Sequence, residues 1–170
     1  MLFTNKGLPL PTSKQNDVIN SFCAETMDAA GVISVSVESG LSDSGKNTVV
    51  TLEEVYNWDA DVIFCNEYTV TEYVLSHKKW AALTAVRNQR VYTLPIGATR
   101  WGHHGSMEPH MAALFIAQLL YPDQFADIDM EEITYEYYKK FFRMDLDDET
   151  IGKILSGRGM RESSSNLLME

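Results

Sequence analysis

Residues 90–120 read RVYTLPIGATRWGHHGSMEPHMAALFIAQLL, and this stretch holds most of the unusual chemistry of the chain. The run Val91–Leu94 is typical of a β-strand, which Pro95 stops. A loop spaced by glycines follows, and then a strongly apolar helix whose first turn carries Glu108 and Pro109. A strand, a glycine-rich loop and a helix start, in that order, form the usual place where an α/β protein holds a ligand.

The composition is that of one ordinary globular domain, with 170 residues of which 45% are apolar and 22% charged. The formal net charge of −10 argues against nucleic acid and against an anionic membrane surface as partners, because both bind through Lys and Arg. The two cysteines, Cys23 and Cys65, lack metal-ligand spacing, and we interpret them as buried apolar residues. The sequence contains no apolar run of membrane-spanning length, and residues 1–14 do not resemble a signal peptide.

Strand patterns alternate with helix patterns along the chain. Strands are expected at residues 2–4, 32–37, 61–65 and 91–94, and helices from Asp17, Thr51, Val70, Trp80, Ser106, Met130 and Asp147. The run 61–65 (DVIFC) is almost wholly apolar, which is typical of a strand buried on both faces of a parallel sheet. Thr51 and Glu54 form a capping-box pattern. The alternation predicts an α/β fold, a three-layer α/β/α sandwich with a mostly parallel sheet.

Several of these segments together resemble one protein family. The order TLEEVYNWDADVIF, HKKWAALTAVRNQRVYTLP, a Trp-containing loop and GSMEPHMAALFIAQLLYPDQFADID resembles the C-terminal lobe of class III substrate-binding proteins of ABC transporters, which handle iron-siderophores, haem and cobalamin. The resemblance covers residues 1–156, and we expect residues 157–170 to form a disordered tail. It implies a two-lobed periplasmic binding protein that encloses its ligand between the lobes.

The resemblance also implies what the rest of such a protein would be. This chain would be a truncated domain, and the N-terminal lobe, the connecting helix and the secretion or lipoprotein signal would belong to a longer parent. That parent would be extracytoplasmic, either periplasmic or anchored to the membrane as a lipoprotein. Its partners would be an ABC transporter permease and a small-molecule ligand, which is an iron chelate (siderophore or haem), cobalamin or an oxyanion. No cofactor is expected.

The candidate ligand-binding residues lie after the two central strands. Trp101 would offer a flat apolar wall for a chelate or macrocycle, with packing over the helix start as the alternative. Arg100, with free amides at the start of the next helix, would suit an anionic group, and a surface salt bridge is equally compatible. Asn66, Glu67 and Tyr68 follow the first central strand and would lie at the same edge of the sheet. Tyr68 would contact the ligand there, and Glu67 would either contact it or cap the next helical segment.

The loop histidines have three interpretations. His103 and His104 are adjacent, so in an extended loop they point in opposite directions and do not readily chelate one metal. His110 could join one of them, but no Cys or nearby Asp completes a set of three ligands. Contact with polar groups of a bound ligand is therefore favoured over direct metal coordination. Solvated loop histidines are the remaining alternative.

The resemblance places Glu108 near an exposed glutamate that docks onto arginines of the permease. The helix dipole alone also explains a carboxylate in the first turn. The sequence has no GxSxG, Walker loop, HExxH or GxGxxG after a strand, so we expect a binding protein and not an enzyme. Two rival functions stay open: a metal-binding enzyme or metallochaperone domain that uses His103, His104 and His110, and a stand-alone protein-interaction domain whose Trp101 loop binds a protein.

Overall fold

The computed structural model describes residues 2–4, 10–11, 17–20, 26–27, 29–32, 35, 47–103 and 105–159. Its elements in chain order are β1 Leu2–Thr4, β2 Leu10–Pro11, β3 Asp17–Asn20, β4 Asn47–Val50, α3 Leu52–Trp58, β5 Val62–Cys65, α4 Tyr68–Ser76, α5 Thr84–Arg87, β6 Val91–Thr93, α6 Pro109–Leu120, α7 Met130–Tyr137, the π-helix η1 Tyr138–Phe142 and α8 Asp148–Leu155. Within these residues, none of the helices has the length and apolar character needed to cross a membrane.

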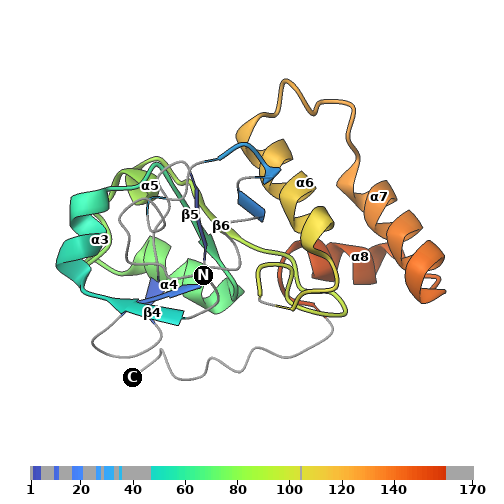
Figure 1. The fold of residues 1–170 in the computed structure, drawn as a ribbon, viewed down its shortest axis with the longest axis horizontal. Coiled ribbons are helices and arrows are strands. Elements are labelled where there is room, and N and C mark those ends of the chain that lie inside the picture. Colours follow the sequence, from blue (N-terminus) through green and yellow to red (C-terminus); the bar gives the residue numbers. More distant parts are fainter. Residues whose placement is uncertain are drawn as a thin grey trace.

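Strands β5 and β6 form the middle layer of a three-layer sandwich. They run parallel, with Ile63 opposite Val91. All four residues of β5 are buried, and they face two sides in turn: Ile63 and Cys65 contact the core beneath α3, α4 and α5, whereas Val62 and Phe64 contact the core beneath α6. Figure 1 shows the two groups of helices on opposite sides of these strands. The predicted α/β fold with a buried parallel pair is therefore confirmed.

The remaining strands pair antiparallel. Strand β1, predicted from the sequence, lies beside β5, and β2, β3 and β4 form a second sheet. The helix predicted from Asp17 is wrong at its start, because Asp17–Asn20 forms β3; helical residues follow at Thr26 and Met27. Strand partners on both sides of β3 override a helical spacing of apolar residues. The strand predicted at 32–37 is wrong at Val35, which is helical, and most of that range lies outside the described residues.

Local hydrogen bonds explain where the helices on the α3 side begin. The predicted capping box is confirmed: the Glu54 amide donates to Thr51 Oγ1 at 3.2 Å, and the Thr51 amide donates to Glu54 Oε2 at 2.7 Å. The helix predicted from Trp80 begins later, at Thr84. Asp59 accepts hydrogen bonds from the Thr84 amide and hydroxyl, both at 2.8 Å, so its side chain satisfies the amide at this helix start.

The end of α8 closes against the end of β6. Asp147 caps α8 as predicted, accepting a bond of 2.8 Å from the Thr150 amide. A Cβ on Gly157, which has φ of +71°, would lie 2.3 Å from Thr93 Cγ2, so only glycine fits this approach. Residues 160–170 of the predicted tail lie outside the described residues. The contact fixes the point at which the chain leaves β6 and enters the loop before α6.

Candidate functional site

The two central strands end side by side, and the predicted ligand-binding residues follow them. The Leu94 amide donates to the Cys65 carbonyl at 2.7 Å, and the hydroxyls of Thr71 and Thr93 lie 2.7 Å apart. We call Asn66, Glu67, Tyr68, Arg100 and His103 the strand-end group. Because β5 and β6 are parallel, the segments after them meet at the carboxyl edge of the sheet, where ligand crevices of open α/β sheets lie.

An ion pair joins the segments that follow the two strands. Arg100 Nη2 donates to Glu67 Oε1, and the side chains are 37% and 16% exposed. Of the two interpretations of Arg100, the salt bridge is therefore the one seen in this structure. The pair also confirms that residues predicted to share one edge of the sheet do meet there.

Asn66 and Tyr68 each make one contact with a distant segment. Asn66 Nδ2 donates to the Gly102 carbonyl at 3.3 Å, and its Oδ1 is buried without a hydrogen-bond partner among the described residues. Tyr68 begins α4, and the guanidinium of Arg158 lies over its ring at 4.8 Å from the centroid. Asn66 thus ties the segment just after Arg100 to the end of β5, while its Oδ1 has no partner among the described residues.

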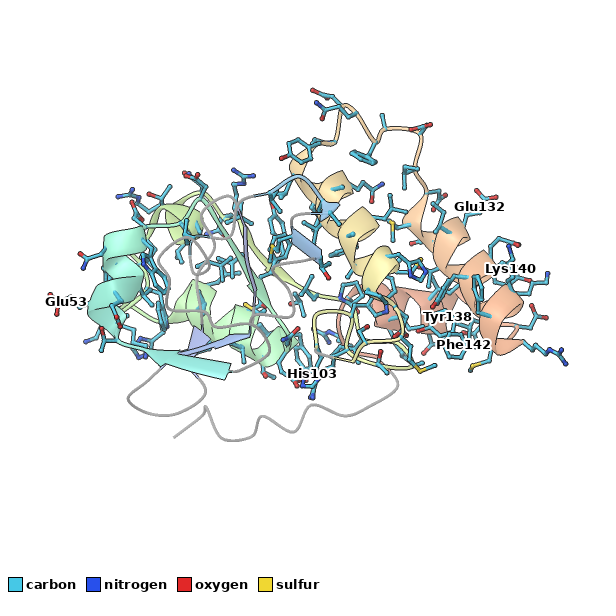
Figure 2. The ribbon with its side chains drawn as sticks, viewed as in Figure 1. Glu53, His103, Glu132, Tyr138, Lys140 and Phe142 are labelled. Atoms are coloured by element: carbon cyan, nitrogen blue, oxygen red, sulfur yellow. The ribbon has the colours of Figure 1, made fainter. Side chains whose placement is uncertain are left out.

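The histidines do not come together as a metal centre. His103 is exposed, and Figure 2 shows it to the lower left of the labelled Tyr138. His110 is exposed and lies edge-on to the ring of Tyr137, with 5.0 Å between centroids. The predicted site residue His104 lies outside the described residues. In the part of the chain that the structure describes, His, Cys, Asp and Glu side chains form no group of three that could hold a metal ion.

Trp101 lies inside the core, which corrects the prediction of an exposed apolar wall. Its side chain has 0% exposure, packs in one cluster with Met111 and Tyr138, and meets Phe115 edge-to-face at 6.3 Å. Its amide donates to the Pro95 carbonyl at 3.1 Å, which ties the backbone of the loop at this residue. Trp101 therefore has the packing role that was the alternative interpretation.

Glu108 is also buried, which contradicts its predicted role as an exposed docking residue. Its side chain is 0% exposed, and its Oε1 accepts from the Tyr138 hydroxyl at 2.6 Å and from the Thr99 amide at 3.3 Å. Its Oε2 accepts from the Thr99 hydroxyl. The prediction is wrong because three hydrogen-bond donors hold the carboxylate inside the protein, where a permease arginine cannot reach it.

The residues around Glu108 form a compact polar cluster, which we call the Glu108 cluster: Gly97, Thr99, Glu108 and Tyr138. The Tyr138 hydroxyl accepts from the Ala98 amide at 2.8 Å. Burial, followed by the hydrogen bond to Glu108, raises the pKa of Tyr138 above its ordinary value, so the hydroxyl stays a neutral donor. A Cβ on Gly97 would lie 1.7 Å from the Tyr138 hydroxyl oxygen, so only glycine lets Tyr138 reach Glu108.

Two of the amides around the start of α6 are already paired within the loop. The Met107 amide donates to Thr99 Oγ1, and the Glu108 amide donates to Ser106 Oγ, both at 3.0 Å. The sequence does not reveal that these two amides are already bonded and so are not available to a ligand. It also gave no signal for Tyr138, which meets Glu108 from 30 residues along the chain.

Cys65 behaves as predicted. It is fully buried on β5, and burial raises the pKa of its thiol to about 12, so it is neither a metal ligand nor a reactive thiolate at neutral pH. Cys23 lies outside the described residues.

Comparisons with known proteins identify relatives among solute-binding proteins. No family model matches the chain. The molybdate-binding protein MolA of Haemophilus influenzae is 30% identical over 96 residues, which are 55% of this chain and 27% of that protein. Its structure with molybdate matches with a TM-score of 0.60 and 25% identity, over 75% of this chain and 38% of the other.

Two further solved structures share the fold over most of the chain. An ABC-transporter solute-binding protein from Sulfurospirillum deleyianum matches with a TM-score of 0.67 and 25% identity, over 87% of this chain and 46% of the other. A periplasmic solute-binding protein from Veillonella parvula matches with a TM-score of 0.66 and 24% identity, over 81% and 43%. The chain thus spans about a quarter of its curated relative and less than half of these solved chains. Over the matched residues, the chain is thus similar in sequence and fold to part of the periplasmic solute-binding proteins of ABC transporters.

Proposed function

We propose that this chain forms the C-terminal lobe of the binding protein of an ABC importer, and that the strand-end group lines one wall of its ligand site. The observation that carries the proposal is the meeting of Glu67 and Arg100, which come from the segments after two parallel strands. That edge is where open α/β sheets bind ligands, and it holds a cation together with the exposed His103. Binding, and no catalytic step, is the activity that these residues support.

The proposed ligand carries anionic oxygens. Arg100 is a donor suited to carboxylates and oxyanions, and its side chain is 37% exposed. MolA is a molybdate-binding protein, which supports an oxyanion. An iron chelate such as a siderophore or haem, or cobalamin, also fits the family resemblance. His103 and the undescribed His104 are proposed to contact polar groups of that ligand.

The proposal extends to the parent protein and its partners. The parent would be extracytoplasmic, would close a second lobe over the ligand, and would deliver it to a permease. Coverage of less than half of the solved relatives supports the need for a second lobe. Glu108 is not part of the docking proposal, because its carboxylate is buried.

A binding screen on the native-length protein tests the proposal. Isothermal titration calorimetry with molybdate, haem, cobalamin and a ferric siderophore should find one saturable solute. Arg100→Gln should weaken that binding by more than about tenfold, because it removes a charge-assisted hydrogen bond. Absence of binding for every solute, or unchanged affinity in the Arg100 variant, would overturn the assignment of the ligand wall.

The rival functions gain no support from a specific contact. His103 and His110 are not part of a three-ligand group among the described residues, and the side chain of Trp101 is buried and so presents no surface to a partner protein. The named relatives are binding proteins of transporters, which favours transport over catalysis.

A further inference from the structure

The ion pair between Glu67 and Arg100 lies where the proposed function needs a site for an anion. We infer that Glu67 is an internal substitute for the solute: its carboxylate occupies Arg100 in the ligand-free chain, and an anionic oxygen of the solute displaces it. The inference rests on the proposed function, since it takes the strand-end group as the ligand wall. It adds a residue that opposes binding and thereby sets the affinity and the charge selectivity of the site.

Glu67 starts α4 without capping it through its side chain. Glu67 is the N-cap residue of α4, with φ of −140° and ψ of 133°, yet its side chain makes no capping hydrogen bond. Asp129 and Asp147, at the equivalent positions of α7 and α8, do cap with their side chains. The Glu67 carboxylate instead reaches Arg100, so displacing it from Arg100 removes no side-chain capping bond at the start of α4.

Arg100 is held so that another anion can take the place of Glu67. Its backbone is fixed by a bridge to Ile96 and by the His103 amide, which donates to the Arg100 carbonyl at 3.1 Å. Its side chain is 37% exposed even while paired, so solvent reaches the guanidinium. The guanidinium has five N–H donors, more than one carboxylate can use. Partly exposed ion pairs add little stability, so exchanging one anion for another is inexpensive in free energy.

The residue before Glu67 indicates what else the solute carries. Asn66 Oδ1 is buried and lacks a hydrogen-bond partner among the described residues. A buried acceptor without a donor is rare in folded proteins and marks a place that water, an ion or a ligand completes. A hydroxyl or a metal-bound water of the solute would supply the donor that Asn66 Oδ1 lacks. Protonated oxyanions and hydrated metal chelates have this chemistry.

The test compares matched variants of the native-length protein by isothermal titration calorimetry with sodium molybdate and with ferric citrate. Glu67→Gln should bind one of these anions about threefold to tenfold more tightly than the wild type, because the internal competitor is gone. Glu72→Gln is the matched control: it makes the same charge change on α4, where Glu72 is exposed and lies 3.8 Å from Arg158. Its affinity should stay within about twofold of the wild type.

The outcomes separate the inference from the proposed function. Tightening confined to molybdate identifies a free oxyanion as the solute, and tightening confined to ferric citrate identifies an anionic oxygen of a chelate; both support displacement of Glu67. Weaker binding in Glu67→Gln overturns the inference, because Glu67 then contacts the solute itself. Equal tightening in the Glu67 and Glu72 variants, or no binding of either anion to any variant, also overturns it. The proposed function fails if the wild type also binds neither haem, cobalamin nor a siderophore, or if Arg100→Gln leaves the affinity for the bound solute unchanged.

Discussion

Two glutamates of this chain, Glu67 and Glu108, each follow a central strand but differ in the exposure of their hydrogen-bond partners. Glu67 pairs with a cation that is 37% exposed, and Glu108 is fully buried among hydroxyl and amide donors. The Glu108 donors come from its own loop and from Tyr138, so its bonds hold the loop in shape. The bond of Glu67 is to a side chain that solvent reaches. Glu108 therefore has the surroundings of a carboxylate that holds the fold together. Glu67 has those of a carboxylate that another anion could replace, because solvent reaches its partner Arg100.

The largest expected effect is on Glu108, the buried glutamate. Glu108→Ala should lower the free energy of unfolding by about 3 kcal/mol, because it leaves the buried Tyr138 hydroxyl and the half-buried Thr99 donors without their acceptor. Urea unfolding followed by circular dichroism measures the loss. Glu132→Ala, at an exposed residue of α7 labelled in Figure 2, should change stability by less than about 0.5 kcal/mol. Equal losses in the two variants would show that Glu108 is not held as described.

The next largest effect comes from filling the space beside Gly97 that the Tyr138 hydroxyl occupies. Gly97→Ala should cost about 2 kcal/mol of unfolding free energy, because its Cβ would lie 1.7 Å from the Tyr138 hydroxyl oxygen. Gly152→Ala on α8 is the matched control, since nothing lies within 4 Å of a Cβ there. It should be neutral or stabilise the protein by up to about 1 kcal/mol through helix propensity. A neutral Gly97 variant in the same urea assay would contradict the observed approach of Tyr138.

A smaller effect separates the Tyr138 hydroxyl from its ring. Tyr138→Phe should cost about 1 kcal/mol at neutral pH, the worth of its hydrogen bond to Glu108. The hydroxyl also carries a pH signature. The folded chain raises the pKa of Tyr138 above 10.0, so folding retains the proton that the unfolded chain releases. This contribution is complete below pH about 10 and is lost as the pH rises above it. Melting temperatures measured from pH 8 to pH 11 should therefore fall less steeply in the variant.

The smallest effect is on Glu67, the glutamate that another anion could replace. Glu67→Gln should change the free energy of unfolding by no more than about 0.5 kcal/mol, because Arg100 is partly exposed and solvent screens the pair. The same substitution at Glu108 should cost at least about 1.5 kcal/mol, since its bonds are buried. Urea unfolding of both variants measures the two losses of unfolding free energy, which can then be compared. Similar costs would remove the distinction between the two glutamates.

The sequence predicted the elements whose signals are local. The apolar run of β5, the Thr51–Glu54 capping box and the Asp147 cap are confirmed, because each depends on residues within one turn or one strand. The helix predicted from Asp17 was wrong at its start. A short apolar run does not distinguish a helix from a strand by its spacing, and the strands that pair with β3 come from other segments of the chain.

The sequence was enough to predict where the candidate site lies, but not which of its side chains are exposed. Glu67 and Arg100 do meet, since parallel strands bring their carboxyl ends together. The burial of Trp101 and Glu108 was not predictable, because the residues that enclose them include Tyr138, which lies far along the chain. A glutamate in the first turn of a helix looks the same in sequence whether it faces solvent or a buried tyrosine.

The π-helix η1 has a consequence for how relatives of this chain can differ in length. A π-turn is an α-turn that contains one extra residue, so loss of a single codon between Lys139 and Phe141 would restore an α-helix. Tyr138 precedes that point and would keep its bond to Glu108. The residues after it would rotate by about 100° around the helix axis, and Phe142 would leave its stacked position 5.1 Å from Tyr138. A relative with a one-residue gap here would therefore keep the bond between Tyr138 and Glu108 but change which side chains after Tyr138 face the core.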